Sequence, residues 1–482
     1  MKRILYWFRN DLRLHDNEGF SRAVQQADEV LPVFVFDPQL FDELPDLGFR
    51  KADVFRATFL IECVADLRRS LRNRGAHLIV RVGDPAKILA ELAQQVGASA
   101  IYAGKEVTSE EIDVESTLSK LLKPHNINLE LFWQSTLYHL RDLPFEVSRL
   151  PDVFSQFRNQ VERRAKIRAT FDDPVRVKLV PDIDPGDMPN LATFGFSSEL
   201  IEASNHPDVR RAVSFKGGET VALERLERYL WGSDLIKTYK ETRNGLLGED
   251  YSSKFSAWLA HGCLSPRLIY EEVMRYEDER VKNDSTYWLI FELIWRDFFR
   301  FVALRFGDRI FKSSGIRHDL SKRWRRDQNL FIKWTEGETG IPFIDANMRE
   351  LALTGFMSNR GRQNVGSFLV KDLGIDWTWG AAWFESLLVD YDPCSNWCNW
   401  NYVAGVGNDP REDRYFNIYS QATRYDEQGS YVKHWLPELA EVPTSKVHLV
   451  SNLSRAEQEQ YGIALGDTYP MPLINPNKWL KK

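Results

Sequence analysis

The sequence predicts two domains of different fold class: an N-terminal doubly wound parallel α/β domain and, after a long connector, a C-terminal all-α domain. Three observations predict this order. Short apolar runs alternate with helical patterns over residues 1–135, prolines gather over 136–210, and a helical period of 3.6 residues prevails over 211–482. The length of 482 residues agrees with two to three domains of about 150 residues each.

The first part repeats one unit. Five nearly continuous apolar runs alternate with three helical patterns, which is typical of a parallel sheet covered on both faces. The runs are 4–8, 30–36, 77–82, 98–103 and 128–133, and the helical patterns are 53–74, 85–96 and 109–122. Asp84 and Pro85 are typical of a helix start, as N-cap and first helical residue. Neither GxGxxG nor GxxxxGK[ST] occurs, so a standard dinucleotide or P-loop site is not expected.

The loop at 9–17 follows the first strand and is dense in charged and amide groups. Ligands of open α/β sheets bind at the carboxyl ends of strands, where this loop is placed. Two interpretations stay open: a ligand-binding loop, or a hydrogen-bonded structural loop.

The connector at 136–210 is rich in proline and carries one helical pattern, 153–168, with five basic residues. We interpret those basic residues as a solvated helix face. Beyond residue 210 the sequence predicts helices at 220–231, 256–261, 265–276, 287–306, 344–353, 365–373 and 381–389.

Composition excludes several classes. A content of 43% hydrophobic and 27% charged residues rules out collagen-like, coiled-coil and wholly disordered chains. No apolar run reaches the roughly 18 residues of a membrane span, and no signal or transit peptide is recognisable. Four Cys do not make a disulfide framework, and Cys394 and Cys398 lack a second pair for zinc. We expect a cytoplasmic monomer with reduced, mostly buried thiols, no metal and no membrane contact.

Tryptophan is unevenly distributed. Only Trp7 and Trp133 of the 15 Trp precede residue 210. A core does not require Trp in particular, so the later excess indicates stacking surfaces, electron carriers, or both. The net charge of −6 gives no global attraction for nucleic acid, so any such binding depends on local patches.

Three segments of the second part carry candidate chemistry. Glu292, Trp295, Arg296 and Phe299 share one face of the helix predicted at 287–306, which suits a heterocycle with imide groups. The alternative is an ordinary amphipathic helix with an i,i+4 Glu–Arg pair. The run 357–364 holds two Arg and two Asn, and 390–402 alternates polar with aromatic groups as a ligand-lining loop that leads into a helix.

Hydroxyl groups at Ser252, Ser253 and Ser256 mark a helix start, where phosphate often binds. Neither a nucleophile elbow nor HExxH is present. Aromatic, amide and Arg side chains around a cavity fit a redox-active heterocycle better than hydrolysis.

Together these motifs resemble the photolyase/cryptochrome family, and within it the cryptochrome DASH branch. The resemblance covers essentially the whole chain, through 7–17, 239–245, 258–266, 292–299, 347–351, 357–364 and 390–402. It implies an antenna domain, a connector and a helical domain that holds FAD. It also implies light-driven repair of cyclobutane pyrimidine dimers in DNA, by electron donation from excited reduced FAD to bases flipped out of the stack.

The resemblance also implies residue roles. Asn396 would face flavin N5, and Arg362 and Asp390 would pair beside the flavin. The other cofactor-binding residues would be Tyr239, Ser252, Ser253, Lys254, Phe255, Ser256 and Asp392. Glu292, Trp295 and Asn359 would hold the flipped dimer, and Arg360 the DNA backbone. Trp400, Trp377 and Trp324 would carry electrons, while Trp231, Trp258, Trp334 and Trp383 would be core packing. Glu106 would bind a 5,10-methenyltetrahydrofolate antenna.

Two residues depart from the duplex-repairing photolyases. Tyr402 stands where those enzymes usually have a second Trp, and Gln363 where they commonly have Met. Both weaken the apolar wall of the dimer pocket, which favours single-stranded DNA because less energy is needed there to unstack the bases. The main alternative is a blue-light photoreceptor that binds DNA or a partner and signals without significant repair. A third is a flavoprotein of dark electron transfer.

Overall fold

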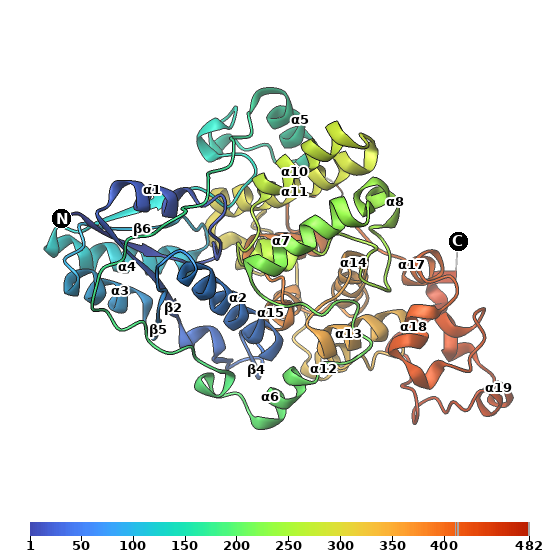
Figure 1. Cartoon of the computed structure of the whole chain (residues 1–482). Helices are drawn as coiled ribbons and strands as arrows, with labels where there is room; N and C mark the ends of the chain where they lie inside the picture. Colours follow the sequence, from blue (N-terminus) through green and yellow to red (C-terminus); the bar gives the residue numbers. More distant parts are fainter. Residues whose placement is uncertain (410, 412–413, 481–482) are drawn as a thin grey trace.

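The computed structural model describes residues 1–409, 411 and 414–480. Its N-terminal part is a parallel sheet in the order β5-β2-β1-β6-β7, with helices on both faces (Figure 1). The strands are β1 (Arg3–Trp7), β2 (Glu29–Phe36), β5 (Ile79–Val82), β6 (Ala100–Gly104) and β7 (Asn128–Phe132). The helices are α1 (Glu18–Gln26), α2 (Val54–Arg72), α3 (Pro85–Gln95) and α4 (Ser109–Leu122). The predicted doubly wound domain is confirmed.

Alternate residues of β1 enter two separate cores, as expected of a strand covered on both faces. Tyr6 packs with Phe20 of α1 and with α2, in the core that continues into the second half of the chain. Leu5 packs with Leu89 of α3 and with α4 in a smaller core. Asp84 caps α3 by accepting hydrogen bonds from the backbone N–H groups of Ala86 and Lys87, as predicted. A short hairpin of β3 (Glu43–Leu44) and β4 (Phe49–Arg50) was not predicted.

The loop at 9–17 joins the two halves of the chain. Asp16 is fully buried and forms an ion pair with Arg267 at 2.5 Å, and His15 pairs with Glu219 at the same distance. Burial opposes ionisation of Glu219, but the hydrogen bonds from His15 lower its pKa below the usual value. The structure supports the hydrogen-bonded interpretation of this loop, although Arg9 and Asn10 also line a cavity of about 190 Å³ at the carboxyl edge of the sheet.

The connector runs over the surface and carries two helices, α5 (Phe154–Arg164) and α6 (Ser198–Asn205). The helix α5 ends four residues earlier than predicted, and α6 was not predicted. The basic residues Arg163 and Arg164 are exposed, in agreement with a solvated face. The predicted domain boundaries at 135 and 210 stay predictions.

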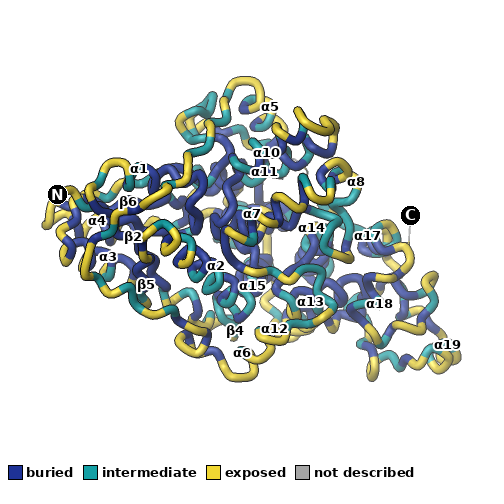
Figure 2. The backbone as a smooth tube through the Cα atoms, viewed as in Figure 1, coloured by how far each residue is buried: buried dark blue, intermediate teal, exposed yellow. Residues whose placement is uncertain are grey.

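The second half is helical, which confirms the predicted fold class. Its helices are α7 (Glu219–Glu227), α8 (Tyr239–Thr242), α9 (Ser256–Ala260), α10 (Pro266–Glu279), α11 (Asp284–Phe306), α12 (Gln328–Thr335), α13 (Pro342–Thr354), α14 (Asn359–Ser367), α15 (Trp377–Leu387), α16 (Pro393–Ala404), α17 (Ile418–Tyr425), α18 (Ser430–Trp435) and α19 (Arg455–Gln460). Figure 2 shows α11, α15 and the sheet as largely buried, beneath an exposed outer layer. All four Cys are free and buried, as predicted.

Two helices begin earlier than the sequence patterns indicated. The segment expected as a loop at 390–402 is helical from Pro393, because Asp392 caps α16 by accepting from the Ser395 backbone N–H at 2.6 Å. The polar run at 357–364 is mostly the first turns of α14, capped by Ser358. In both places an N-cap side chain offsets the weak helix propensity of the residues that follow.

Candidate functional site

Two adjoining cavities lie among the central helices and share the walls Asn359, Arg362, Asp390, Asp392 and Ser395. The outer cavity, of about 270 Å³, is also lined by Tyr239, Ser252, Ser253, Lys254, Phe255, Ser256 and Glu292. The inner cavity, of about 120 Å³, is also lined by Gln363, Asn396 and Trp400. The structure therefore gathers all ten predicted cofactor-binding residues, which come from four separate segments of the sequence.

Lys254 gives the outer cavity an unpaired positive group. The side chain is buried, its ammonium has no hydrogen-bond partner among the described residues, and it lies 3.2 Å from the centre of the Tyr251 ring. Its backbone is left-handed, with φ of +60°. Burial lowers the pKa of Lys254 well below its usual range. A buried ammonium beside three serines fits a diphosphate, so the residues present fit FAD.

The predicted ion pair between Arg362 and Asp390 is present. One guanidinium nitrogen, Nη2, donates to both carboxylate oxygens of Asp390, at 2.8 and 2.9 Å. The Nε group of Arg362 donates to the Met357 carbonyl, which fixes the guanidinium at the junction of the two cavities. Asn396 donates from Nδ2 to the Ala381 carbonyl at 3.0 Å and is nine-tenths buried on the inner cavity wall. Its predicted approach to flavin N5 stays a prediction.

Glu292 has a partner that sequence spacing did not indicate. Its carboxylate pairs with Arg243 at 2.8 Å, not with Arg296. The Arg296 side chain instead donates to the carbonyls of Ser135 and Leu259. The amphipathic alternative with a Glu–Arg pair along one helix is therefore wrong. Burial raises the pKa of Glu292, and the charge of Arg243 opposes that rise.

Trp295 of α11 and Tyr402 of α16 form an aromatic pair, and the residues that follow them in the sequence, Arg296 and Val403, line the outer and inner cavities. Their ring centroids lie 6.0 Å apart with planes at 79°. Trp295 is half-buried, and Phe299 contacts both rings. Asn359 is exposed at the cavity mouth. Trp295, Phe299 and Tyr402 thus lie in mutual contact, and the contact of Trp295, Asn359 and Tyr402 with a dimer stays a prediction.

Arg360 is held within the protein. Its guanidinium donates to Asn244 and Gln363, each at 2.8 Å, and lies 4.4 Å from the centre of the Tyr425 ring. Burial lowers its pKa, and the nearby charges of Arg243, Arg424 and Arg414 lower it further. Sequence reasoning missed Arg414 and Arg424, because no motif links α17 and the segment before it to α14. Two of the five N–H groups of Arg360 are used in its hydrogen bonds to Asn244 and Gln363, and its predicted phosphate contact stays a prediction.

The predicted electron carriers are placed in two groups. Trp400 is buried on the inner cavity, with its ring 5.1 Å from Phe384 and 6.4 Å from Trp334. Trp377 and Trp324 both donate their indole N–H to the Ser313 carbonyl, at 3.0 and 3.1 Å. Trp377 is fully buried and Trp324 half-exposed, so the pair extends from the core to the surface.

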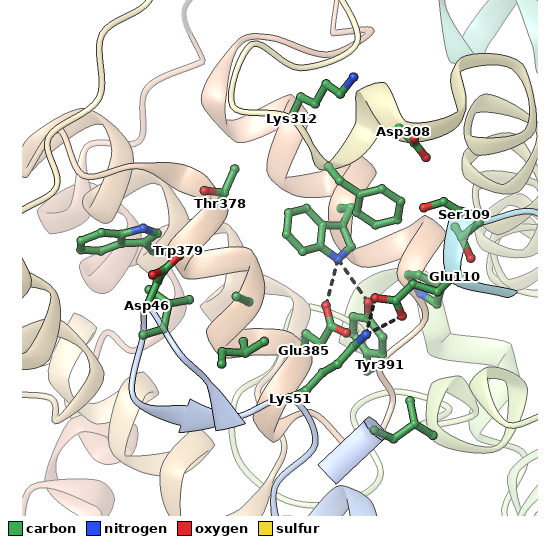
Figure 3. A pocket seen from close by; sticks show the side chains of 18 of the residues that line it. Asp46, Lys51, Ser109, Glu110, Asp308, Lys312, Thr378, Trp379, Glu385 and Tyr391 are labelled. Carbon is green, nitrogen blue, oxygen red and sulfur yellow. Dashed lines mark hydrogen bonds and ion pairs between the residues drawn. The ribbon is translucent and has the colours of Figure 1, made fainter. Parts of the chain in front are cut away.

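A larger cavity, of about 820 Å³, lies between the two halves of the chain (Figure 3). Thr108, Ser109, Glu110 and Glu111 line it from the α/β part. Trp379, Glu385, Tyr391 and Trp397 line it from the helical part. Figure 3 shows Lys51 reaching Glu110 next to Glu385 and Tyr391. Trp397 donates to Glu385 at 3.2 Å and to the Tyr391 hydroxyl at 3.1 Å. Sequence reasoning missed this cavity because its walls share no motif.

Glu106, the predicted antenna residue, is not on the walls of that cavity. It is buried and pairs with Arg300 at 2.5 Å, and Arg300 in turn lies 4.0 Å from Asp392. Its role in antenna binding stays a prediction. Among the described residues, no group of three or more His, Cys, Asp or Glu side chains is arranged to hold a metal ion. Within the same part of the chain, every helix is too short or too polar to cross a bilayer.

Family models match both halves of the chain. Residues 4–177 match DNA photolyase, and residues 288–482 match the FAD binding domain of DNA photolyase. These matches define an FAD-binding chain with the two-part architecture of photolyases.

Known relatives extend over nearly the whole length. The chain is 52% identical to the cryptochrome DASH of Gloeobacter violaceus over 474 residues, which cover 98% of this chain and 93% of the relative. It is 49% identical to the cryptochrome DASH of Xenopus laevis, over 99% of this chain and 90% of the relative. The crystal structure of a Synechocystis cryptochrome matches with a TM-score of 0.94 and 49% identity, over 100% of this chain and 98% of that one. The chain belongs to the photolyase/cryptochrome family, in its cryptochrome DASH branch.

The family also includes more distant solved structures. A bacterial class III photolyase from Agrobacterium tumefaciens matches with a TM-score of 0.85 and 27% identity, over 99% of this chain and 95% of that one. The resemblance of the sequence to this family, and the FAD-binding domain it implies, are confirmed.

Proposed function

We propose that this protein is a light-driven enzyme that repairs cyclobutane pyrimidine dimers in DNA, with a preference for single-stranded DNA. The observation that carries the proposal is that Glu292 and Asn359 line the outer of the two cavities that fit FAD, while Trp295, one helical turn after Glu292 on α11, contacts Tyr402. A carboxyl, an amide and two aromatic rings suit a flipped pyrimidine pair, which presents imide edges and flat faces. A flavoprotein that only transfers electrons in the dark would not require these four side chains.

When bound and reduced, FAD supplies the light-excited electron donor. The protein residues have the task of binding and orienting the dimer. Burial raises the pKa of Glu292 while Arg243 opposes that rise, and in its protonated form the carboxyl can donate a hydrogen bond to a pyrimidine carbonyl. Arg243 keeps that carboxyl in place from the opposite side. Trp295 offers a surface for stacking, and Asn359 stands exposed at the mouth to hold a base edge.

The preference for single strands follows from Tyr402 and Gln363, the two residues that depart from the duplex-repairing photolyases. Tyr402 presents a smaller ring than Trp and a hydroxyl without a hydrogen-bond partner, and Gln363 is polar and tied to Arg360. A wall that gains less energy from the dimer offsets less of the energy needed to flip two bases from a duplex. We expect DNA to reach the site along a rim that includes Arg243, Arg360, Arg414 and Arg424.

We infer that Trp400, Trp377 and Trp324 supply electrons to the cofactor from the surface. Trp400 lies on the inner cavity wall, and the shared carbonyl of Ser313 holds the other two indoles near each other. Electrons carried by these three indoles would convert the oxidised cofactor to its reduced form. This reduction is separate from the repair reaction itself.

We infer that the cavity between the halves of the chain holds a methenyltetrahydrofolate antenna. It is large enough for a small heterocycle, and Tyr391 lines both this cavity and the inner cofactor cavity. The ring of Tyr391 is fixed by Arg56, at 4.3 Å, and by Trp397. A shared wall keeps the two chromophores close. The cytoplasmic location and monomeric state also remain part of this proposal.

The deciding experiment illuminates the reduced protein with a thymine dimer in single-stranded and in duplex oligonucleotides of the same sequence. Repair is followed by the return of thymine absorbance. We expect efficient repair of the single strand and much weaker repair of the duplex. Equal rates on the two substrates would contradict the strand preference, and no repair of either would contradict the enzyme.

The rival candidate is a photoreceptor that binds DNA without significant repair. The observation in its favour is the polar character of Tyr402 and Gln363, which would hold a flipped dimer less firmly than apolar side chains. That function predicts undamaged and damaged strands bound alike and no change in dimer content after illumination.

A further inference from the structure

The indole of Trp295 has one face already covered by a ring from the connector. Phe154, the first residue of α5, stacks on Trp295 with centroids 3.6 Å apart and planes 9° from parallel. Phe154 is only 6% exposed. At this distance no base can lie between the two rings, so this face of the indole is closed to a ligand.

The helix α5 is fixed on α11 along its whole length. Phe154 also meets Phe291 and Phe298 edge-on, at 5.2 and 5.7 Å. Phe157, one turn later, contacts Phe298 at 5.2 Å and is fully buried. The Tyr287 hydroxyl donates to Glu162 at 2.6 Å near the end of α5. Figure 1 shows α5 beside α11, and the two helices are in contact. Lifting α5 would expose these buried rings, so Phe154 is a permanent wall and not a lid.

This packing determines which face of the Trp295 indole a ligand can reach. With one face of Trp295 against Phe154, a pyrimidine can stack only on the opposite face. Tyr402 stands nearly perpendicular to the indole, at 79°, and bounds the space beside it. A stacked, buried ring also holds the indole plane, because rotation about χ2 would drive it into Phe154.

We propose that Phe154 is a positioning residue for the DNA substrate: it fixes the plane of Trp295 and leaves one defined face for the damaged base. This inference rests on the proposed repair function. It makes the connector part of the substrate site, although Phe154 itself does not contact DNA.

The test compares Phe154→Leu with Phe157→Leu. Both changes remove one ring from the same helix, but only Phe154 contacts Trp295. Dissociation constants are measured with a single-stranded oligonucleotide with and without a thymine dimer, together with repair at saturating substrate. Phe154→Tyr keeps the flat ring and serves as the rescue variant. Flavin absorbance and the thermal midpoint show that each variant is folded and loaded.

We expect Phe154→Leu to weaken binding of the dimer about five- to tenfold, the range expected for a lost aromatic stack. Binding of the undamaged strand, flavin content and repair of bound dimer should stay at the wild-type level, and Phe154→Tyr should restore affinity. An equal loss in Phe157→Leu, or no loss in Phe154→Leu, would overturn the proposal. Tighter binding in Phe154→Leu would also overturn it, because Phe154 would then occupy the substrate face. Wild-type protein that repairs no dimer would instead remove the proposed function on which the inference rests.

Discussion

Glu292 of α11 forms an ion pair with Arg243, which follows α8, with 2.8 Å between Oε1 and Nη2. The pair joins two elements 49 residues apart at the wall of the outer cavity. Burial raises the pKa of the carboxyl while the guanidinium opposes that rise. The balance decides whether Glu292 carries a proton when substrate arrives, and so whether it donates or accepts a hydrogen bond.

The first prediction concerns the proton on Glu292. Glu292→Ala removes the hydrogen bond from the protonated carboxyl to the dimer and should reduce repair about 2- to 10-fold, the range for a hydrogen bond between neutral groups. Glu292→Gln keeps an N–H donor and should retain most activity. Wild-type repair should fall as pH rises through the pKa of the carboxyl, because the donor is lost, while the Gln variant stays flat. A Gln variant as weak as the Ala variant would contradict the donor role.

The second prediction concerns Arg243, the partner of Glu292 in the ion pair. In Arg243→Gln the guanidinium no longer opposes the effect of burial, so the pKa of Glu292 should rise further. The alkaline limb of the repair profile should therefore move to higher pH. Repair is measured against pH with saturating single-stranded substrate, after flavin content is checked, because Arg243 also lines the cofactor cavity. Repair that rises, instead of falling, as pH passes through this range would show that the active carboxyl is ionised, and a limb that does not move would show that Glu292 does not cause it.

The third prediction separates photoreduction from repair. Trp400→Phe should lose most photoreduction of the oxidised flavin and keep repair once the flavin is reduced chemically. Trp383→Phe is the control, since Trp383 packs edge-on against Phe49 at 5.0 Å as part of the core. Photoreduction is measured as the change in flavin absorbance under blue light. Normal photoreduction in Trp400→Phe would assign the first step to another ring, and Trp334, whose centroid lies 6.4 Å from that of Trp400, would be the next to test.

The fourth prediction is a pH dependence of stability. Asp297 of α11 accepts hydrogen bonds from the backbone N–H groups of Leu137 and Tyr138, and burial raises its pKa to about 7. The folded state holds this proton between about pH 4 and 7 while the unfolded state releases it. Stability should therefore decrease as pH rises through that window, by at most about 1.4 kcal/mol per pH unit from this group. Asp297→Asn should flatten the dependence, as measured by urea midpoints at pH 5 and pH 8. If stability depends on pH as steeply in Asp297→Asn as in the wild type, groups other than Asp297 cause the dependence.

Sequence periodicity predicts which side chains share one face of a single helix or strand. It does not predict contacts between elements that are distant in the sequence. The spacing of Glu292, Trp295 and Phe299 predicts their shared face, and N-cap signals place helix starts such as Asp84–Pro85. Contacts between distant elements have no such signal. Arg243 replaces Arg296 as the partner of Glu292, Phe154 covers Trp295, and Asn244 and Tyr425 hold Arg360. These contacts depend on how the helices pack, which no local pattern encodes.

The last prediction concerns the cavity between the halves of the chain. Thr378 of α15 lines its helical wall, as Figure 3 shows, and is half-exposed. In Thr378→Trp the larger side chain should fill part of the cavity and prevent a folate antenna from binding. The near-ultraviolet folate absorbance should be absent from this variant after reconstitution, while flavin absorbance stays, because Thr378 does not line the cofactor cavities. Repair under light absorbed by the flavin alone should be unchanged, and repair under near-ultraviolet light should fall to the level of antenna-free wild type. Full folate binding in Thr378→Trp would place the antenna elsewhere, with the surroundings of Glu106 as the next site to test.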